Sequence, residues 1–247
     1  SGQPGLLDEH CSHRGSSLAN GSAEEDGIRC PYHGWLYNKG GHCLEMPTEP
    51  PDSRFRETIR HPAYPTKEVG GLIFAYMGPP DKKPPFPRYE QLFREDGVID
   101  TGLGNRYLTA NALLQNLDNV LDIWHREVLH GWWKQEPKEG SLHFGKDGRP
   151  ASPVKYEHTP WGGCYSVLQD TDRPGIYEYH ETHGALPGVR ISAPGGWPRL
   201  IWFVPRDDFS TRGFGVTFLP YEKNGKLSEA SEARLGNNDV PLDSGGN

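Results

Sequence analysis

The residues best suited to chemistry form two short groups near the start of the chain, each with one cysteine and one histidine. Cys11 and His13 make up the first group, and Cys30 and His33 make up the second. Two thiolates and two imidazoles can hold a [2Fe–2S] cluster, with both cysteines on one iron and both histidines on the other. Replacing two thiolates by neutral imidazoles raises the reduction potential of such a cluster. The four residues therefore predict a protein that passes single electrons.

A structural zinc site is the alternative, because cysteine and histidine also bind zinc. Zinc modules usually pair like residues at close spacing, as in C-x-x-C and H-x-x-x-H. In this chain each group mixes the two residue types, and only one residue separates Cys11 from His13. The pattern favours the iron–sulfur cluster over zinc.

A second group of polar residues lies in the otherwise apolar segment 113–133, which the sequence predicts to be helical. At 100° per residue, Asp122 and His125 lie roughly 60° apart and share one helix face. His125 and His130 are five positions apart, which is roughly 140° in a regular helix. A π-bulge or helix end between the two histidines would bring both imidazoles to one side. We therefore expect irregular helix geometry between His125 and His130.

Two histidines and a carboxylate, with positions left open, are the ligands of non-haem Fe(II) oxygenases. The second group therefore suggests a mononuclear iron site that accepts dioxygen. The alternative is a polar helix face whose partners lie elsewhere in the fold. The first group weakens this alternative, because it already marks the chain as a metal and redox protein.

Composition limits both the fold and the partners. The chain has 247 residues with 31 Gly, 23 Pro and 2 Met, which indicates strands and turns rather than a helix bundle. Its formal net charge of -7, without a run of basic residues, argues against nucleic acid or an acidic membrane as the main partner. No apolar stretch approaches the ~18 residues of a membrane span, and no signal-peptide pattern opens the chain. We therefore expect a cytoplasmic protein, and the use of cysteine fits a reducing compartment.

The chain is predicted to divide at a proline-rich segment. Residues 1–78 show short strand patterns separated by Gly, Asn and Pro, and predict a small β domain. Residues 79–103 begin with five prolines in nine positions and predict an extended connector. Residues 104–247 predict a strand and the helix, followed by a series of strands, in an antiparallel sheet that grips a helix. The whole chain is thus expected to be α+β.

The expected strands of the first domain lie at 28–30, 35–38 and 71–77, and those of the second at 104–111, 154–158, 164–168, 176–182, 199–204 and 214–219. His180 and His183 fall in one of these segments and are expected to be ordinary strand residues.

The residues around the first group resemble a known family. The sequences CSHRG at 11–15 and CPYHGW at 30–35 resemble the Rieske domain of ring-hydroxylating and related non-haem iron oxygenases. The respiratory-chain Rieske proteins carry an extra cysteine in each loop, which forms a disulfide. Here the remaining cysteines, Cys43 and Cys164, lie outside both loops.

The spacing of Asp122, His125 and His130, with Asp118 and Asn119 just before it, resembles the iron motif of the phthalate-dioxygenase and dicamba-monooxygenase type. The resemblance implies that the two histidines bind the mononuclear iron. It also implies that Asp122 forms a hydrogen-bonded bridge to a cluster histidine of the neighbouring subunit, with Asn119 as a further candidate at this site. A ligating imidazole needs an acceptor on its other nitrogen, which gives the bridge a physical basis.

The family's third iron ligand is an aspartate on a later helix, and the sequence does not assign it. Asp207 and Asp208 follow a strand pattern and are expected in a turn, while Asp239 and Asp243 fall in a Gly/Asn-rich tail. The family also has several strands before its first cysteine. The resemblance therefore implies that the chain is truncated at both ends.

The resemblance implies the oxygenase component of a Rieske-type mono- or dioxygenase, with a catalytic domain of the helix-grip, START-like fold. Electrons from NAD(P)H would pass through a flavin/iron–sulfur reductase to the cluster and on to Fe(II). O2 would then hydroxylate or O-demethylate an aromatic or similar small organic substrate. A homotrimer with head-to-tail contacts is also implied, because the electron path crosses between subunits. The alternative is a Rieske-type electron carrier without a functional second iron.

Overall fold

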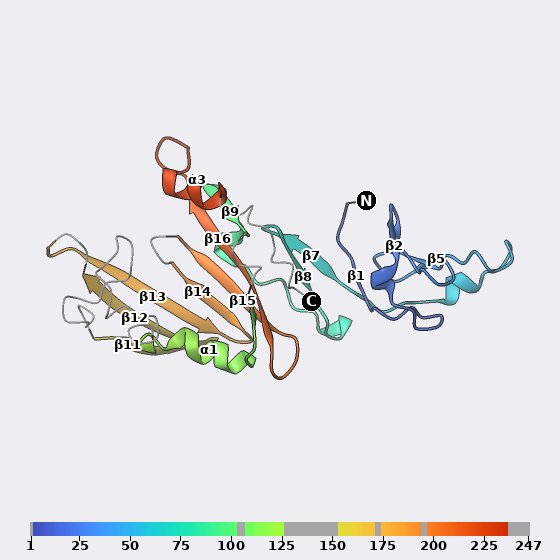
Figure 1. Ribbon diagram of the computed structural model, residues 1–247, viewed down its shortest axis with the longest axis horizontal. Coiled ribbons are helices and arrows are strands. Elements are labelled where there is room, and N and C mark those ends of the chain that lie inside the picture. The colour runs from blue at the N-terminus through green and yellow to red at the C-terminus, as the bar shows by residue number, and fades with distance from the viewer. Residues whose placement is uncertain (1, 103–106, 126–152, 171–173, 194–196, 237–247) are drawn as a thin grey trace. The chain divides into compact units, whose positions relative to one another are not determined.

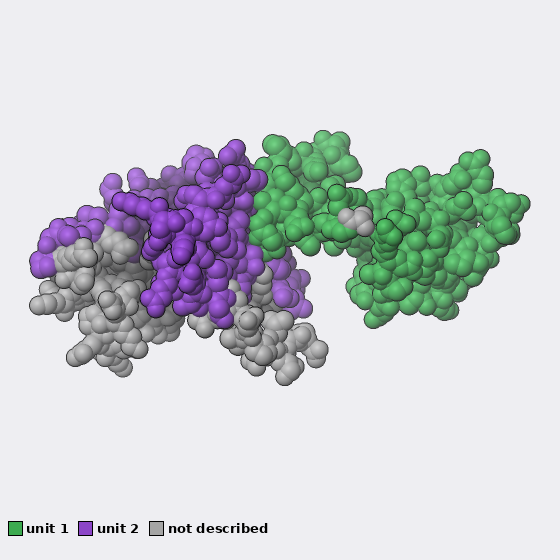
Figure 2. Space-filling model, turned by 90° about the horizontal axis from the view of Figure 1, so that it is seen from above, with its two compact units in different colours: residues 1–87 green, residues 88–247 purple. Residues whose placement is uncertain are grey.

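The computed structural model describes residues 2–102, 107–125, 153–170, 174–193 and 197–236. The chain forms two compact units, Ser1–Pro87 and Arg88–Asn247 (Figure 2). The division lies inside segment 79–103, which the sequence predicts as a connector. The limits of that connector at residues 79 and 103 stay a prediction. Mostly antiparallel strands with few helices make up both units, which confirms the α+β class (Figure 1).

Unit 1 is built from short strands and 3-10 helices. Four strands form a sheet in the order β2-β3-β4-β5, and β1 pairs with β6 and β7 with β8, all antiparallel. The bounds are β1 Leu6–Leu7, η1 Leu18–Asn20, β2 Ser22–Glu24, β3 Gly27–Arg29, β4 Leu36–Tyr37, β5 Cys43–Glu45, η2 Phe55–Thr58, β6 Ala63–Tyr64, β7 Thr66–Val69, β8 Leu72–Ala75 and η3 Pro80–Lys82. One ligand group lies between β1 and η1, and the other lies between β3 and β4.

Unit 2 is an antiparallel sheet with helices packed against it. The strand order is β10-β16-β15-β14-β13-β12-β11, and β9 also pairs with β16. The bounds are η4 Glu90–Leu92, β9 Gly97–Asp100, β10 Tyr107–Thr109, α1 Leu113–Leu121, β11 Lys155–Thr159, β12 Gly162–Asp170, β13 Tyr177–Ala185, β14 Val189–Ser192, β15 Arg199–Pro205, β16 Thr211–Pro220 and α3 Glu229–Gly236. The sequence pattern missed β9, which lies in the segment predicted as a connector, as well as β14, which is too short to show a clear alternation, and α3.

Two glycines let α1 pack closely against the sheet, Gly184 in β13 and Gly188 in the turn before β14. The helix crosses β12, β13, β14 and β15 (Figure 1). A Cβ at Gly184 would lie 3.2 Å from Cγ of Leu121, and a Cβ at Gly188 would lie 2.9 Å from Cδ1 of Leu113. Side chains at these two positions would push the helix away from the sheet.

The helix α1 is shorter than the pattern at 113–133 predicts, because it ends at Leu121. Asp122 has extended backbone, with φ of -89° and ψ of 100°. Its Oδ1 accepts hydrogen bonds from the backbone N–H of Trp124 at 2.9 Å and of His125 at 3.3 Å. Such a local turn competes with helix continuation. The expectation that Asp122 and His125 share one face of a regular helix is therefore wrong, and the turn brings them together instead.

A buried ion pair attaches α3 to the sheet. The Nε of Arg234 donates to Oδ2 of Asp100 at 2.7 Å, and its Nη2 donates to Oγ1 of Thr217 at 3.0 Å. The other carboxylate oxygen of Asp100 accepts the N–H of Gly102 at 2.8 Å.

None of the helices within the described ranges has the length and apolar character needed to cross a bilayer.

Candidate functional site

The two ligand loops of unit 1 share one backbone pattern. In each loop the N–H of the cysteine donates to the carbonyl five residues on, and the N–H four residues on donates to the cysteine carbonyl. These distances are 2.9 and 2.8 Å for Cys11, and 2.9 and 3.1 Å for Cys30. Gly15 and Gly34 occupy the same place in the two turns, with φ of +71° and +75°. Side chains disfavour this left-handed backbone, which explains a glycine at both positions.

The four predicted cluster ligands lie together, thiol with thiol and imidazole with imidazole. Cys11 and Cys30 are each 3% exposed and belong to one buried cluster of side chains. The ring centroids of His13 and His33 are 4.6 Å apart. This is the pairing expected when two cysteines bind one iron and two histidines bind the other.

The surroundings of these residues favour the charge states that bind iron. Burial acts to raise the pKa of the Cys30 thiol, but hydrogen bonds from the N–H of Tyr32 and from Cys11 lower that pKa overall. The pKa of His13 is lowered by lost hydration and by the neighbouring imidazole of His33. Nδ1 of His13 is buried and has no hydrogen-bond partner among the described residues. Metals bind thiolate and neutral imidazole, so the donor set fits a [2Fe–2S] cluster.

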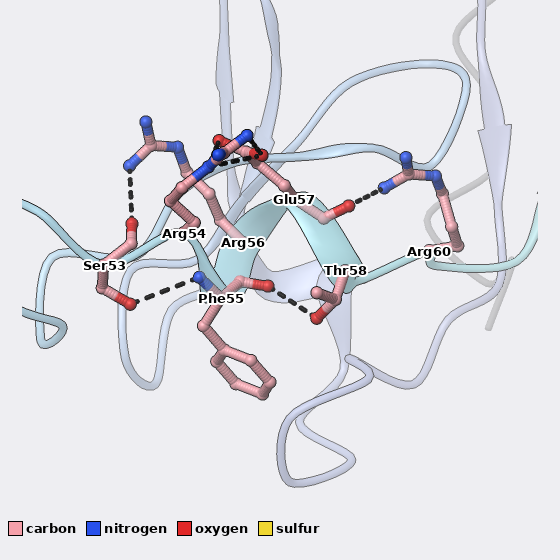
Figure 3. A network of polar contacts seen from close by, with 7 residues as sticks. All are labelled: Ser53, Arg54, Phe55, Arg56, Glu57, Thr58 and Arg60. Atoms are coloured by element: carbon pink, nitrogen blue, oxygen red, sulfur yellow. Dashed lines mark hydrogen bonds and ion pairs between the residues drawn. The ribbon is translucent and has the colours of Figure 1, made fainter.

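Trp35 covers the histidine side of the site. Its indole stacks on the imidazole of His13 with 4.5 Å between centroids and 4° between planes. The ring of Phe55 meets the indole edge-on, at 6.3 Å and 82°. Figure 3 shows the polar contacts around η2 that hold this phenylalanine, among them the 2.7 Å ion pair of Arg54 and Glu57. These aromatic rings shield the imidazole from water.

Tyr37 was not singled out from the sequence, yet it contacts a predicted ligand. It is fully buried, and its Oη lies 3.3 Å from Sγ of Cys11. Burial and the Cys11 hydrogen bond raise the pKa of Tyr37, so the phenol keeps its proton and donates to a thiolate. Its position two residues after Trp35, on a strand leaving the ligand loop, places both rings on one side. The two-residue spacing of Trp35 and Tyr37 was the sequence signal that could have placed Tyr37 near the cluster ligands.

Replacing Tyr37 by phenylalanine is expected to lower the reduction potential of the cluster by about 40 mV. A donated hydrogen bond stabilises the more negative, reduced cluster by about 1 kcal/mol, and a one-electron couple shifts by about 59 mV for each 1.4 kcal/mol. A redox titration followed by electron paramagnetic resonance (EPR) measures the shift. An unchanged or higher potential would show that the hydroxyl does not donate to the cluster.

In unit 2, polar side chains contact both nitrogens of the His125 imidazole. Nδ2 of Asn119 lies 3.3 Å from Nε2, and Oδ2 of Asp122 lies 3.4 Å from Nδ1. A proton on Nδ1 suits both contacts, because the amide then donates to the lone pair on Nε2, and the carboxylate lies beside the Nδ1 proton as an electrostatic contact rather than a hydrogen bond. In this tautomer Nε2 carries the lone pair that binds a metal, and an iron there would take the place of the Asn119 amide.

The turn that carries these residues is anchored by Ile123. This side chain is 1% exposed and packs against Tyr165 and Val167 of β12. Asp122 directly precedes the buried isoleucine and His125 follows it two residues later, so its packing holds the turn that carries both. Their own side chains remain 47% and 18% exposed.

His130, the second predicted iron ligand, lies outside the described residues, as does the predicted irregularity between it and His125. Within the described ranges no three His, Cys, Asp or Glu side chains surround one point. The ligand set of the mononuclear iron therefore stays a prediction.

The third iron ligand stays unassigned, and two of the four aspartates considered for it lie in a turn, as expected from the sequence. Asp207 lies in the turn between β15 and β16, where its carboxylate accepts the N–H of Phe209 and the hydroxyl of Ser210 at 2.8 and 2.9 Å. These hydrogen bonds lower the pKa of Asp207. Asp208 follows in the same turn, whereas residues 239 and 243 lie outside the described ranges.

His180 and His183 lie in β13, where they were expected as strand residues. Nε2 of His183 contacts Oε1 of Glu181, whose other oxygen accepts the hydroxyl of Tyr179. These contacts join residues at alternate positions on one face of the strand.

Comparison with known proteins agrees with these observations. Residues 1–65 match the Rieske [2Fe-2S] domain family. The chain is 36% identical over 229 residues to the alpha subunit of phenoxybenzoate dioxygenase from Ectopseudomonas oleovorans, covering 86% of this chain and 54% of that protein. It is 46% identical over 174 residues to the oxygenase subunit of phthalate 4,5-dioxygenase from Pseudomonas putida, covering 68% and 39%. The chain thus spans about half the length, or less, of these relatives.

Solved structures share the fold. Dicamba monooxygenase bound to dicamba superposes with a TM-score of 0.68 at 17% identity, over 86% of this chain and 66% of that one. The terminal oxygenase of carbazole 1,9a-dioxygenase from Nocardioides aromaticivorans gives 0.67 at 19% identity, over 95% and 71%. The chain therefore carries a Rieske [2Fe–2S] domain and is related in sequence and fold to the oxygenase subunits of Rieske non-haem iron oxygenases.

Proposed function

We propose that this chain belongs to the oxygenase component of a Rieske-type oxygenase. When bound, the cluster supplies single electrons and the mononuclear iron supplies the activation of dioxygen. Cys11, Cys30 and the two histidines of their loops hold the cluster, and His125 and His130 hold the iron. The protein's own contribution is to position these groups and tune their charge states.

The contact geometry of His125 carries this proposal. Asp122 lies at one nitrogen of the imidazole and Asn119 at the other. A carboxylate acceptor on Nδ1 orients an imidazole for ligation through Nε2. An electron carrier without a second iron has no need of this arrangement in a second unit. The oxygenase hypothesis accounts for it, and Asp122 is then the bridge to a cluster histidine of a neighbouring subunit.

The proposed reaction is hydroxylation or O-demethylation of an aromatic or similar small organic compound. The names of relatives support this class, because they include 3-chlorobenzoate-3,4-dioxygenase from Comamonas testosteroni and 5,5'-dehydrodivanillate O-demethylase from a Sphingobium strain. A reductase or ferredoxin would deliver electrons from NAD(P)H. An oxygenase–ferredoxin complex is known for carbazole 1,9a-dioxygenase. A head-to-tail homotrimer and a cytoplasmic location complete the proposal.

Iron quantification tests the proposal against the electron-carrier alternative. The purified, iron-loaded chain is expected to hold about three iron atoms, two in the cluster and one at the mononuclear site. A His125→Ala variant should lose about one iron while it keeps the Rieske EPR signal of the reduced cluster. A wild-type content of about two iron atoms would favour the electron carrier for this chain.

A further inference from the structure

His61 is a buried histidine behind the first ligand loop, and neither the sequence pattern nor the proposed reaction assigns it a role. It is 3% exposed. Its Nδ1 lies 2.8 Å from Oγ of Ser12, and its Nε2 lies 2.8 Å from the carbonyl oxygen of Asp8. Ser12 stands between the predicted ligands Cys11 and His13. The imidazole therefore contacts the loop at its start and at its centre.

The chemistry of the two partners fixes the tautomer of the ring. A carbonyl oxygen only accepts hydrogen bonds, so Nε2 of His61 carries the proton and donates to Asp8. Nδ1 of the neutral ring is then an acceptor, and the hydroxyl of Ser12 donates to it. Both ring nitrogens are used in these bonds. His61 is thus not available as a ligand in this geometry, but it is well suited to holding the loop.

The backbone of His61 is itself held in place. Its N–H donates to the carbonyl of Gly41 at 2.8 Å. Gly41 has a φ of +78°, and a Cβ there would lie 2.0 Å from the carbonyl oxygen of His61. Only glycine allows this approach. The ring of His61 also lies 4.7 Å from that of Tyr37, whose hydroxyl contacts Cys11.

We infer that His61 is a positioning residue for the [2Fe–2S] site. By accepting from Ser12 and donating to Asp8, it holds the first ligand loop in the conformation that directs Cys11 and His13 to the cluster. Hydrogen bonds outside the ligand set commonly orient ligands and tune the metals they hold. The inference rests on the cluster part of the proposed function and is independent of the second iron, the substrate and the oligomer.

Paired substitutions separate the two hydrogen bonds of the ring. The amide of His61→Asn can reach the place of Nδ1 and so keeps an acceptor for Ser12, while it loses the donor to Asp8. The amide of His61→Gln can reach the place of Nε2 and so keeps the donor to Asp8, while it loses the acceptor. Ser12→Ala removes the same bond as His61→Gln from the other side. His42→Gln, at an exposed neighbouring histidine, is the matched control.

The measurements use the full chain loaded with its cluster. They are the rate at which visible absorption of the cluster is lost to an iron chelator, and the EPR spectrum of the reduced cluster. Ser12→Ala leaves the buried Nδ1 of His61 without its donor, and His61→Gln removes the same bond from the loop, so each should speed cluster loss about tenfold and shift the EPR signal. His61→Asn should give a smaller shift of the EPR signal than His61→Gln.

The double variant Ser12→Ala/His61→Gln decides whether the two residues act through one bond. Cluster loss no faster than in either single variant supports the inference, because coupled residues are not additive. Multiplied effects, or single variants within about twofold of the wild type, would overturn it. A wild-type chain without a Rieske EPR signal would instead refute the cluster part of the proposed function, so the two failures are distinct.

Discussion

Substituting asparagine for Asp122 is expected to leave the fold and the cluster content unchanged while oxygenation slows by about 10–100-fold, the usual cost of losing a group that orients a metal ligand. The assay is product formation with reductase and substrate. A single-turnover experiment should show a reduced cluster that persists in the presence of substrate and O2. The expectation follows from the proposed role of Asp122 as the bridge between cluster and iron.

Asparagine is informative because the two carboxylate oxygens of Asp122 have different partners. Oδ1 accepts the backbone N–H groups of Trp124 and His125, and the amide oxygen of asparagine can still accept them. Oδ2 lies 3.4 Å from Nδ1 of His125. An amide nitrogen placed there would face the Nδ1 proton, donor against donor. The substitution thus removes the bridge and its charge while it keeps the turn.

Two further variants serve as controls. Asp118→Asn makes the same charge change at an exposed position of α1 and should leave turnover unchanged. Asp122→Ala removes the turn as well as the bridge, and should lower the free energy of unfolding by about 1 kcal/mol in addition to the loss of activity. Wild-type turnover in Asp122→Asn would mean that electrons reach the iron by another path.

The cluster site could be predicted from the sequence because the ligands of each loop lie close together in the chain. Each ligand loop places a cysteine, a histidine and a turn glycine within six residues, so residue type and spacing fix most of its geometry. The partners of the loops are distant in the chain and left no such pattern. Tyr37 lies 26 positions from Cys11, and His61 lies 49 positions from Ser12. Only the folded chain brings these pairs together.

The end of α1 could not be predicted from the sequence for a different reason. Apolar spacing predicts that it continues through Asp122, but a side chain that hydrogen-bonds to the backbone two and three residues ahead ends it at Leu121. Helical periodicity and a local capping turn compete over the same residues, and tertiary packing decides between them. Here the burial of Ile123 against the sheet favours the turn.

Methionine in place of Arg234 is expected to destabilise unit 2 by about 3–5 kcal/mol, because it removes the cation that is paired with the buried carboxylate of Asp100. The side chain of Asp100 is 0% exposed and that of Arg234 is 13% exposed. A change of that size should lower the midpoint of thermal unfolding by roughly 10 °C. Chemical denaturation gives the free energy of unfolding directly.

A second substitution tests the cause of that loss. In the double variant Asp100→Asn/Arg234→Met no buried charge remains, and the asparagine oxygen can still accept the N–H of Gly102. Most of the lost stability should therefore return, since removing both partners of a buried pair is often close to neutral.

The exposed pair Arg88 and Glu90, with side chains 74% and 70% exposed, gives the comparison. Arg88→Met should change stability by less than about 1 kcal/mol. If the double variant were as unstable as Arg234→Met alone, the packing of the arginine against Trp197 and Thr217, rather than its charge, would anchor α3 to the sheet.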